Sequence, residues 1–286
     1  MGFAPKHAYL VCIDSDGCVF DTMEIKHKEC FCPAYIEYFG LQAVSKYARE
    51  AWEFANLYSA WRGVHRIPVL LKSLDLLAAR TEIKERGFTP PALENLREYV
   101  KNGLPLNNAG LSAYLKARPE AEDIRTTLAW SEETNARINR VVHSVPPFPH
   151  VRASLERLSS VADIVIVSAT QQLSLEREWS EHGLLGCVSM VCGQESGSKK
   201  EIIAALKGDY EPDHVLMIGD APGDRAAAEE NGVLFYPICP DAEAQSWAAF
   251  GKCLDAVLGG TYAAEMQQRM IAHFETLLPE KAAWEE

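Results

Sequence analysis

The sequence lacks any apolar run of the roughly 20 residues that a membrane-spanning helix needs. Residues Met1–Tyr9 also lack an apolar stretch after a basic region, so we expect no signal peptide. Among the eight cysteines the only close pair is Cys30 and Cys32. Its single intervening residue fits neither a zinc-binding nor a redox spacing. These absences predict free thiols and a cytoplasmic protein.

Positive charge is also scarce, since 28 basic residues face 40 acidic ones and the net charge is -12. A surface of this sign repels nucleic acids and anionic membranes, so we expect neither as a partner. A small anionic substrate is still compatible with this composition, because a bound metal ion and a lysine can reverse the local field.

Five short runs are apolar and β-prone throughout, which is typical of strands covered on both faces in a parallel sheet. They are Ala8–Ile13, Ile164–Val167, Cys187–Cys192, Val215–Ile218 and Val233–Tyr236. Helical patterns lie between the last four runs, at Val151–Val161, Leu173–Glu181, Lys200–Leu206 and Asp224–Asn231. This alternation predicts an α/β fold with a doubly wound parallel sheet.

Residues 22–145 contain no clear strand pattern and predict an inserted all-helical domain. Its expected helices are Cys30–Phe39, Val44–Tyr58, Ile67–Ala79, Pro91–Lys101, Gly110–Ala117 and Thr134–Val142. A proline-rich segment then returns to the sheet. The C-terminal part predicts two more helices packed outside the sheet, Ser246–Leu258 and Tyr262–Leu278. We therefore predict a core of residues 1–21 and 146–286 and a helical domain of residues 22–145.

Polar side chains follow three of the predicted strands at the edge where an open α/β sheet binds its ligand. The side chains expected there are Asp14, Asp16, Ser168, Lys199, Asp220 and Asp224. Carboxylates so close together repel one another and need a cation, and oxygen ligands with open positions suit Mg²⁺. The lysine and the hydroxyl remain to hold phosphoryl oxygens. Lys200 is an alternative to Lys199, although helix phase favours Lys199.

These residues resemble the four motifs of the haloacid dehalogenase (HAD) superfamily, in the same order. The motifs are Asp14-Ser15-Asp16-Gly17, Ser168, Lys199 and the run from Gly219 to Asp224. The resemblance covers residues 1–21 and 146–238, and it implies the HAD-like Rossmannoid fold. The insertion resembles the family's helical type 1 cap domain. The chain departs from the family in Cys18 and in lacking a proline after the lysine.

The resemblance implies a phosphatase that acts on a small phosphorylated metabolite. Asp14 would attack phosphorus and form an aspartyl-phosphate. Asp16 would protonate the leaving oxygen and then accept a proton from water. Ser168 and Lys199 would hold the transferring phosphoryl group.

The implied Mg²⁺ would be held by Asp14, by the backbone carbonyl of Asp16 and by Asp220, with Asp224 close by or acting through water. An aspartate at position 16 favours a phosphatase or a phosphomutase over a dehalogenase or phosphonatase. Phosphomutase is the first alternative, and a non-catalytic module that binds a phosphorylated ligand is the second. Asp224 as a helix cap and Ser168 as a strand-end cap are the structural alternatives.

Overall fold

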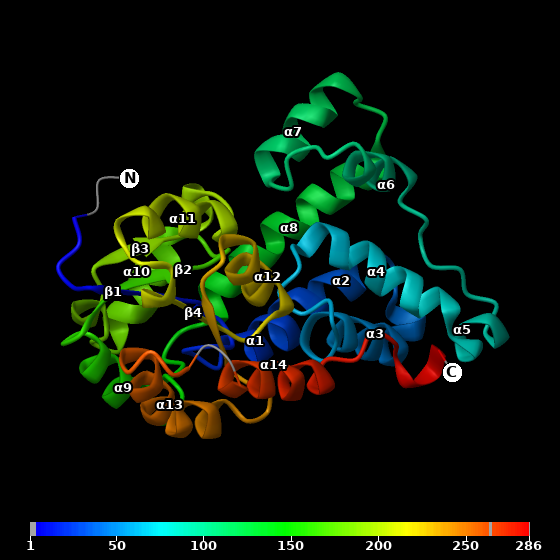
Figure 1. Cartoon of the computed structure of the whole chain (residues 1–286). Coiled ribbons are helices and arrows are strands. Elements are labelled where there is room, and N and C mark those ends of the chain that lie inside the picture. The colour runs from blue at the N-terminus through cyan, green and yellow to red at the C-terminus, as the bar shows by residue number, and fades with distance from the viewer. Residues whose placement is uncertain (1–3, 263–264, 286) are drawn as a thin grey trace. The chain divides into compact units, whose positions relative to one another are not determined.

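A computed structural model describes residues 4–262 and 265–285 of the chain. The chain folds into two compact units (Figure 1). Met1–Met23 and Ser144–Leu278 form the first, which we call the sheet unit. Glu24–His143 and Pro279–Glu286 form the second, the helical unit.

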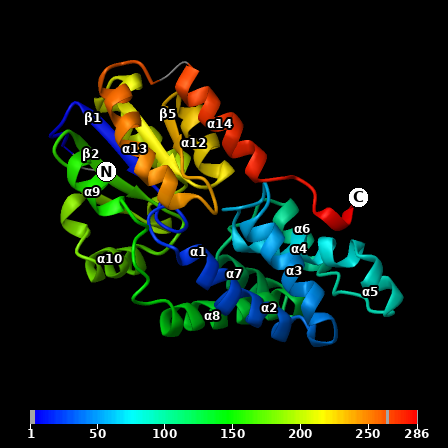
Figure 2. The same ribbon diagram turned by 90° about the horizontal axis from the view of Figure 1, so that it is seen from below.

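The sheet unit is built on five parallel strands in the order β3-β2-β1-β4-β5. The strands are β1 (Tyr9–Ile13), β2 (Ala162–Val167), β3 (Met190–Cys192), β4 (Val215–Gly219) and β5 (Leu234–Pro237). Each of the five apolar runs contributes one strand, and the predicted parallel α/β sheet is confirmed. Figure 2 shows β1 and β2 running side by side in this sheet.

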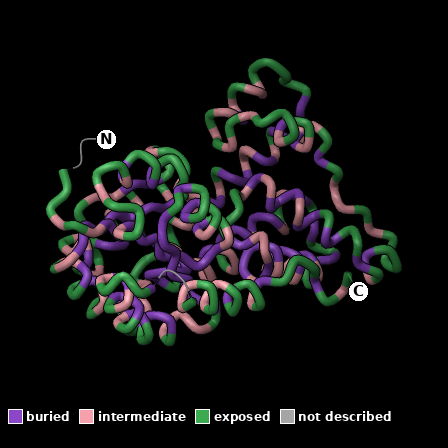
Figure 3. Tube along the Cα trace, in the orientation of Figure 1, coloured by how far each residue is buried: buried purple, intermediate pink, exposed green. Residues whose placement is uncertain are grey.

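Helices cover both faces of the sheet, as the uniformly apolar strands predict. They are α9 (Val151–Leu158), α10 (Gln172–Glu181), α11 (Lys199–Leu206), α12 (Pro222–Asn231), α13 (Glu243–Leu258) and α14 (Glu265–Leu277). Alternate strand residues point into different cores. Val11 and Ile13 pack with α9, α10 and α13, whereas Leu10 and Cys12 pack with α11 and α12. Strands β1, β2, β4 and β5 are accordingly buried along almost their whole length (Figure 3), whereas only Cys192 is buried in the edge strand β3.

The strand order reverses beside β1. From β1 the chain builds outward to β2 and β3, and it then crosses back to add β4 and β5 on the other side. The carboxyl ends of β1 and β4 therefore flank the topological switch point, where open α/β sheets bind their ligands. This topology makes the segments after β1 and β4 neighbours in space.

The helical unit has a core of its own. Its helices are α1 (Thr22–Ile25, which begins in the sheet unit), a π-helical turn (Lys26–Phe31), α2 (Cys32–Tyr38), α3 (Ser45–Leu57), α4 (Arg66–Ala79), α5 (Thr81–Glu85), α6 (Glu94–Lys101), α7 (Asn108–Ala117) and α8 (Glu122–Val141). Trp52 and Trp130 are fully buried, and their rings meet edge to face with centroids 5.9 Å apart. Such aromatic pairs add to the apolar burial that holds the helices together.

Two details of the prediction are wrong in this unit. The last helix was expected over Thr134–Val142, but α8 begins at Glu122. The buried face of this helix includes the polar residues Thr127, Ser131 and Thr134. The helical spacing of its buried positions is therefore not visible as a pattern of apolar residues.

The second detail is the C-terminal tail, because the sequence predicts residues 279–286 as part of the sheet-containing core. In the structure Pro279 accepts a hydrogen bond from the amide of Ala60, and Ala282 is buried in the helical core. The Trp284 ring lies 3.9 Å from the buried guanidinium of Arg80 and meets Phe54 edge to face. The tail thus belongs to the helical unit, because Arg80 and Phe54 supply an apolar and cationic surface for one tryptophan.

Among the helices that the structure describes, none is both long enough and apolar enough to cross a membrane.

We predict that Trp284→Ala destabilises the protein by about 2 kcal/mol, because it removes a cation–π contact and a partly buried aromatic side chain. Denaturation followed by far-UV circular dichroism measures the change. Leu173→Ala is the matched control: this side chain is 81% exposed, so its loss should change stability by less than about 0.5 kcal/mol. Equal stability of Trp284→Ala and Leu173→Ala would show that the tail contributes nothing to the helical unit.

Candidate active site

Two aspartates are brought together at the carboxyl ends of β1 and β4. The amide of Asp14 donates to the carbonyl of Ile218 at 3.0 Å, so the ladder between the strands continues one residue past β1. Asp220 directly follows β4. Asp14 and Asp220 are therefore placed by the register of the sheet itself, and both are buried.

Asp224 joins them from the first turn of α12. Its Oδ2 accepts a hydrogen bond from the amide of Ala221 at 3.0 Å, so it caps the helix, as the structural alternative proposed. Its carboxyl group also lies against the backbone of Gly219, where an added Cβ would come within 2.3 Å of Cγ. A glycine at the end of β4 is thus required for this position of Asp224. The motif that contains Gly219 is visible in the sequence, but the packing of Asp224 against this glycine is not.

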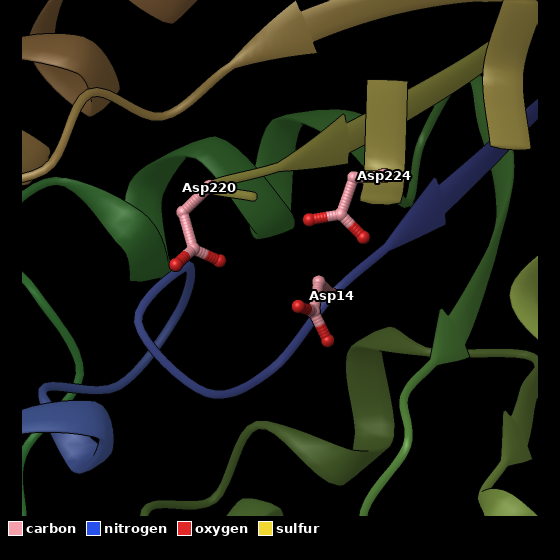
Figure 4. A group of neighbouring side chains, drawn as sticks. All are labelled: Asp14, Asp220 and Asp224. Atoms are coloured by element: carbon pink, nitrogen blue, oxygen red, sulfur yellow. The ribbon is translucent and has the colours of Figure 1, made fainter. Parts of the chain in front are cut away.

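The three carboxylates face one another in Figure 4. An oxygen of each lies within 4.8 Å of an oxygen of the other two, and all three residues are buried. Asp14 extends from β1, Asp220 from the turn after β4 and Asp224 from α12. Residues more than 200 positions apart in the sequence thus form one acidic cluster.

Lys199 places its ammonium in this cluster. Nζ lies 2.6 Å from Asp14 Oδ2 and 2.5 Å from Asp224 Oδ1. The lysine is the first residue of α11, whose start is fixed by reciprocal hydrogen bonds between Ser198 and Glu201. The Ser-x-x-Glu pattern of this capping box is readable in the sequence.

The neighbouring Lys200 points elsewhere. Its Nζ forms an ion pair with Glu230 at 2.5 Å, and its side chain is 61% exposed. Of the two lysines considered from the sequence, Lys199 is the one whose ammonium lies among the aspartates, in agreement with the helix-phase argument.

Burial dominates the electrostatics of this site. It raises the pKa of Asp14 to about 6, where the attraction of Lys199 opposes it and repulsion from Asp224 adds to it. Burial also raises the pKa of Asp224, with Lys199 again opposing and Asp220 adding repulsion. Burial lowers the pKa of Lys199, but the charges of Asp14 and Asp224 outweigh it and the net shift is upward. Burial and mutual repulsion thus disfavour the charged forms of Asp14 and Asp224, whereas Lys199 favours them.

A divalent cation fits the donor set of this cluster. The three buried carboxylates lie close together, and the ammonium of Lys199 contacts two of them. Hard oxygen donors from Asp14, Asp220 and Asp224 are the ligand type that Mg²⁺ takes, with its remaining positions left to water or substrate. The donor set is much less suited to soft metals, since no cysteine or histidine belongs to this cluster of described residues.

Ser168 and Asp16 lie at the same edge but outside the group of three carboxylates. Ser168 directly follows β2, the neighbour of β1, and its amide donates to the carbonyl of Cys192 at 3.1 Å. Its Oγ accepts from the amide of Thr170 at 3.2 Å, so a capping contact is present here too. The carboxylate of Asp16 is held by hydroxyl groups of Thr22 and Thr170. Neither threonine was singled out from the sequence.

Two buried tryptophans fasten the loop that follows β1. Trp179 donates from Nε1 to Ser15 Oγ at 3.0 Å, and Trp247 donates from Nε1 to the carbonyl of Cys18 at 2.7 Å. Gly17 provides the positive φ of 74° that the turn between them needs. No local sequence signal marks either tryptophan, because an isolated apolar residue on a helix indicates only a core position.

The chain aligns with solved structures over most of its length. A predicted phosphoglycolate phosphatase from Haemophilus somnus aligns with a TM-score of 0.51 at 14% identity, over 86% of this chain and 97% of that one. A haloacid dehalogenase-like hydrolase from Xanthomonas campestris aligns at 16% identity over 89% of this chain and 95% of that one, with a TM-score of 0.46. At 14% identity the first of these two matches shows a common fold alone.

No curated protein matches the chain significantly. The family model described as haloacid dehalogenase-like hydrolase matches residues 72–237, more than half of the chain. The match includes Ser168, Lys199, Asp220 and Asp224, whereas Asp14 and Asp16 precede it. The sheet order and this match agree with the resemblance carried by the motifs. The chain belongs to the haloacid dehalogenase-like hydrolase family.

Proposed function

We propose that the protein is a Mg²⁺-dependent phosphohydrolase that cleaves small phosphate monoesters through an aspartyl-phosphate on Asp14. The observation that carries this proposal is the position of the Asp14 carboxylate. It lies at the carboxyl end of the central strand, in contact with Lys199 and within a group of three aspartates. A buried carboxylate next to a phosphate-binding ammonium is suited to nucleophilic attack on phosphorus.

In the first step an oxygen of Asp14 attacks phosphorus. The bond from phosphorus to the leaving oxygen breaks, and that oxygen takes a proton from the carboxylic acid of Asp16. In the second step water attacks the aspartyl-phosphate and gives a proton back to Asp16. The bond between phosphorus and Asp14 then breaks, which releases inorganic phosphate and regenerates both carboxyl groups.

Three further side chains support these steps. Lys199, whose ammonium already contacts Asp14, holds an oxygen of the transferring phosphoryl group and compensates its charge. Ser168, from the neighbouring strand, donates its hydroxyl to a second oxygen. Mg²⁺ held by Asp14, Asp220, Asp224 and the carbonyl of Asp16 supplies further charge compensation when bound.

We propose in addition that the helical segment, residues 22–145, is a cap domain that selects the substrate. The residues at the carboxyl ends of the strands would bind only the phosphoryl group, so another segment must contact the rest of the substrate. The tail after Leu278 folds with this unit.

We predict that Asp14→Asn lowers phosphate release from p-nitrophenyl phosphate by about three orders of magnitude or more, because a carboxamide is a poor nucleophile. The control is Asp213→Asn, an exposed aspartate at the opposite end of β4, which should leave the rate unchanged. Acid-quenched wild-type protein should carry a phosphoryl group on the peptide that contains Asp14. Normal turnover by Asp14→Asn would refute the nucleophile. Conversion of a sugar phosphate to its isomer without phosphate release would favour the mutase instead.

Metal removal is the second test. A chelator should abolish activity, Mg²⁺ should restore it, and Ca²⁺ should restore much less, because its longer bonds and larger shell fit in-line transfer poorly. Mg²⁺ should also raise the melting temperature of the wild type but not of Asp220→Asn, which loses one ligand charge. Full activity in the presence of chelator, or equal rates with both metals, would contradict the proposed metal site.

Substitution of Gly219 tests the packing of Asp224. Gly219→Ala puts a methyl group where the Asp224 carboxyl lies, so Asp224 must move, and we expect a loss of about 10- to 100-fold in Mg²⁺ affinity. Gly208→Ala adds the same atom where nothing lies within 4 Å and should have no effect. Magnesium dependence of the rate measures both variants. Unchanged Mg²⁺ affinity in Gly219→Ala would mean that Asp224 does not hold the metal.

A further inference from the structure

The carboxylate of Asp16 is held by one hydroxyl group on each oxygen. Thr170 Oγ1 donates to Oδ2 at 2.7 Å, and Thr22 Oγ1 donates to Oδ1. Thr22 is buried at the start of α1, a few residues along the same loop. Thr170 comes from the loop after β2, which is 154 residues away in the chain. Two donors on opposite oxygens restrict rotation of the carboxylate and fix the direction in which it points.

Thr170 is itself firmly placed by its backbone. Its amide donates to Ser168 Oγ at 3.2 Å, and its carbonyl accepts from the amide of Gln194 at 3.0 Å. The loop after β3 reaches it through Gly193, where an added Cβ would lie 2.7 Å from the Thr170 carbonyl oxygen and 2.5 Å from the amide nitrogen of Gln172. A second contact, from the Gln172 amide to Glu195 Oε2 at 3.1 Å, ties the same two loops together. The loop that carries the hydroxyl of Thr170 is therefore held in place by hydrogen bonds to the loop after β3.

We infer that Thr170 is a positioning residue, which holds the Asp16 carboxyl group in the orientation for proton transfer to and from the substrate oxygen. The inference rests on the proposed phosphohydrolase function and adds a residue to it. Asp16 lies outside the group of three clustered carboxylates, and a threonine hydroxyl donates to each of its two oxygens. One of these donors, Thr170, comes from the loop that follows a different strand.

Leaving-group dependence separates this role from a structural one. A p-nitrophenolate ion leaves without being protonated, whereas an alkoxide leaving group needs a proton. Misplacement of the general acid therefore lowers the rate of hydrolysis of alkyl phosphates most. We expect Thr170→Val, which keeps the shape and removes the hydroxyl, to lower kcat/KM for an alkyl phosphate by about 10- to 100-fold. For p-nitrophenyl phosphate the loss should be less than about threefold. Thr170→Ser, which restores the donor, should recover most of the alkyl phosphate activity.

The matched control is Thr276→Val on α14, an exposed threonine whose hydroxyl bonds only the carbonyl of His273 in its own helix. It should leave both substrates unaffected. If Thr170→Val fails to fold, as judged by circular dichroism, Thr170→Ala takes its place with the same expectations. In an Asp16→Asn background the substitution at 170 should cause no further change in the ratio of the two rates.

Equal losses for the two substrates, or no loss for either, would overturn the role of Thr170. So would an additional change in the ratio when Asp16 is already asparagine, because Thr170 would then act through another group. Absence of phosphate release from every substrate by wild-type protein with Mg²⁺ would instead overturn the proposed function itself, before any variant is compared.

Discussion

The attraction between one ammonium and the carboxylates around it holds the candidate site together. Lys199 lies between Asp14 and Asp224, two groups that repel each other in a buried environment where water screens little of the repulsion. The three buried carboxylates present hard oxygen donors to one point, and this donor set makes the site suited to a divalent cation. The strand order, the glycine at the end of β4 and the capping box before Lys199 all hold these four side chains in place.

Such a cluster needs rigid support, because charged groups held close together move apart wherever the backbone yields. The loop after β1 receives that support from remote segments. Trp179 on α10 and Trp247 on α13 each donate an indole hydrogen bond to it, and Thr170 on the loop after β2 binds its second aspartate. The apolar packing that stabilises the sheet unit thus also fixes the geometry of the polar edge.

The helical unit contributes a second and separate core. Trp52 and Trp130 lie at its centre, and the C-terminal tail closes part of it through Trp284. The chain therefore passes between the units at three places, near Met23, near His143 and after Leu278. The tail packs on the helical unit through the contact of Trp284 with the buried Arg80. No periodic pattern in the sequence predicts this contact.

The sequence by itself determined the strands, the parallel sheet and the residues of the acidic edge. Strands buried on both faces must be apolar throughout, and polar residues directly after them must lie where the strands end. Local patterns could not determine what depends on contact between distant segments. Helix phase already favours Lys199 over Lys200, but only the tertiary structure places its ammonium between Asp14 and Asp224. The tertiary structure alone also shows the close packing of Asp224 on Gly219, the threonines around Asp16 and the docking of the tail. Each of these depends on a distance between groups that the chain brings together only when it folds, and hydrophobic period and residue type carry no record of such distances.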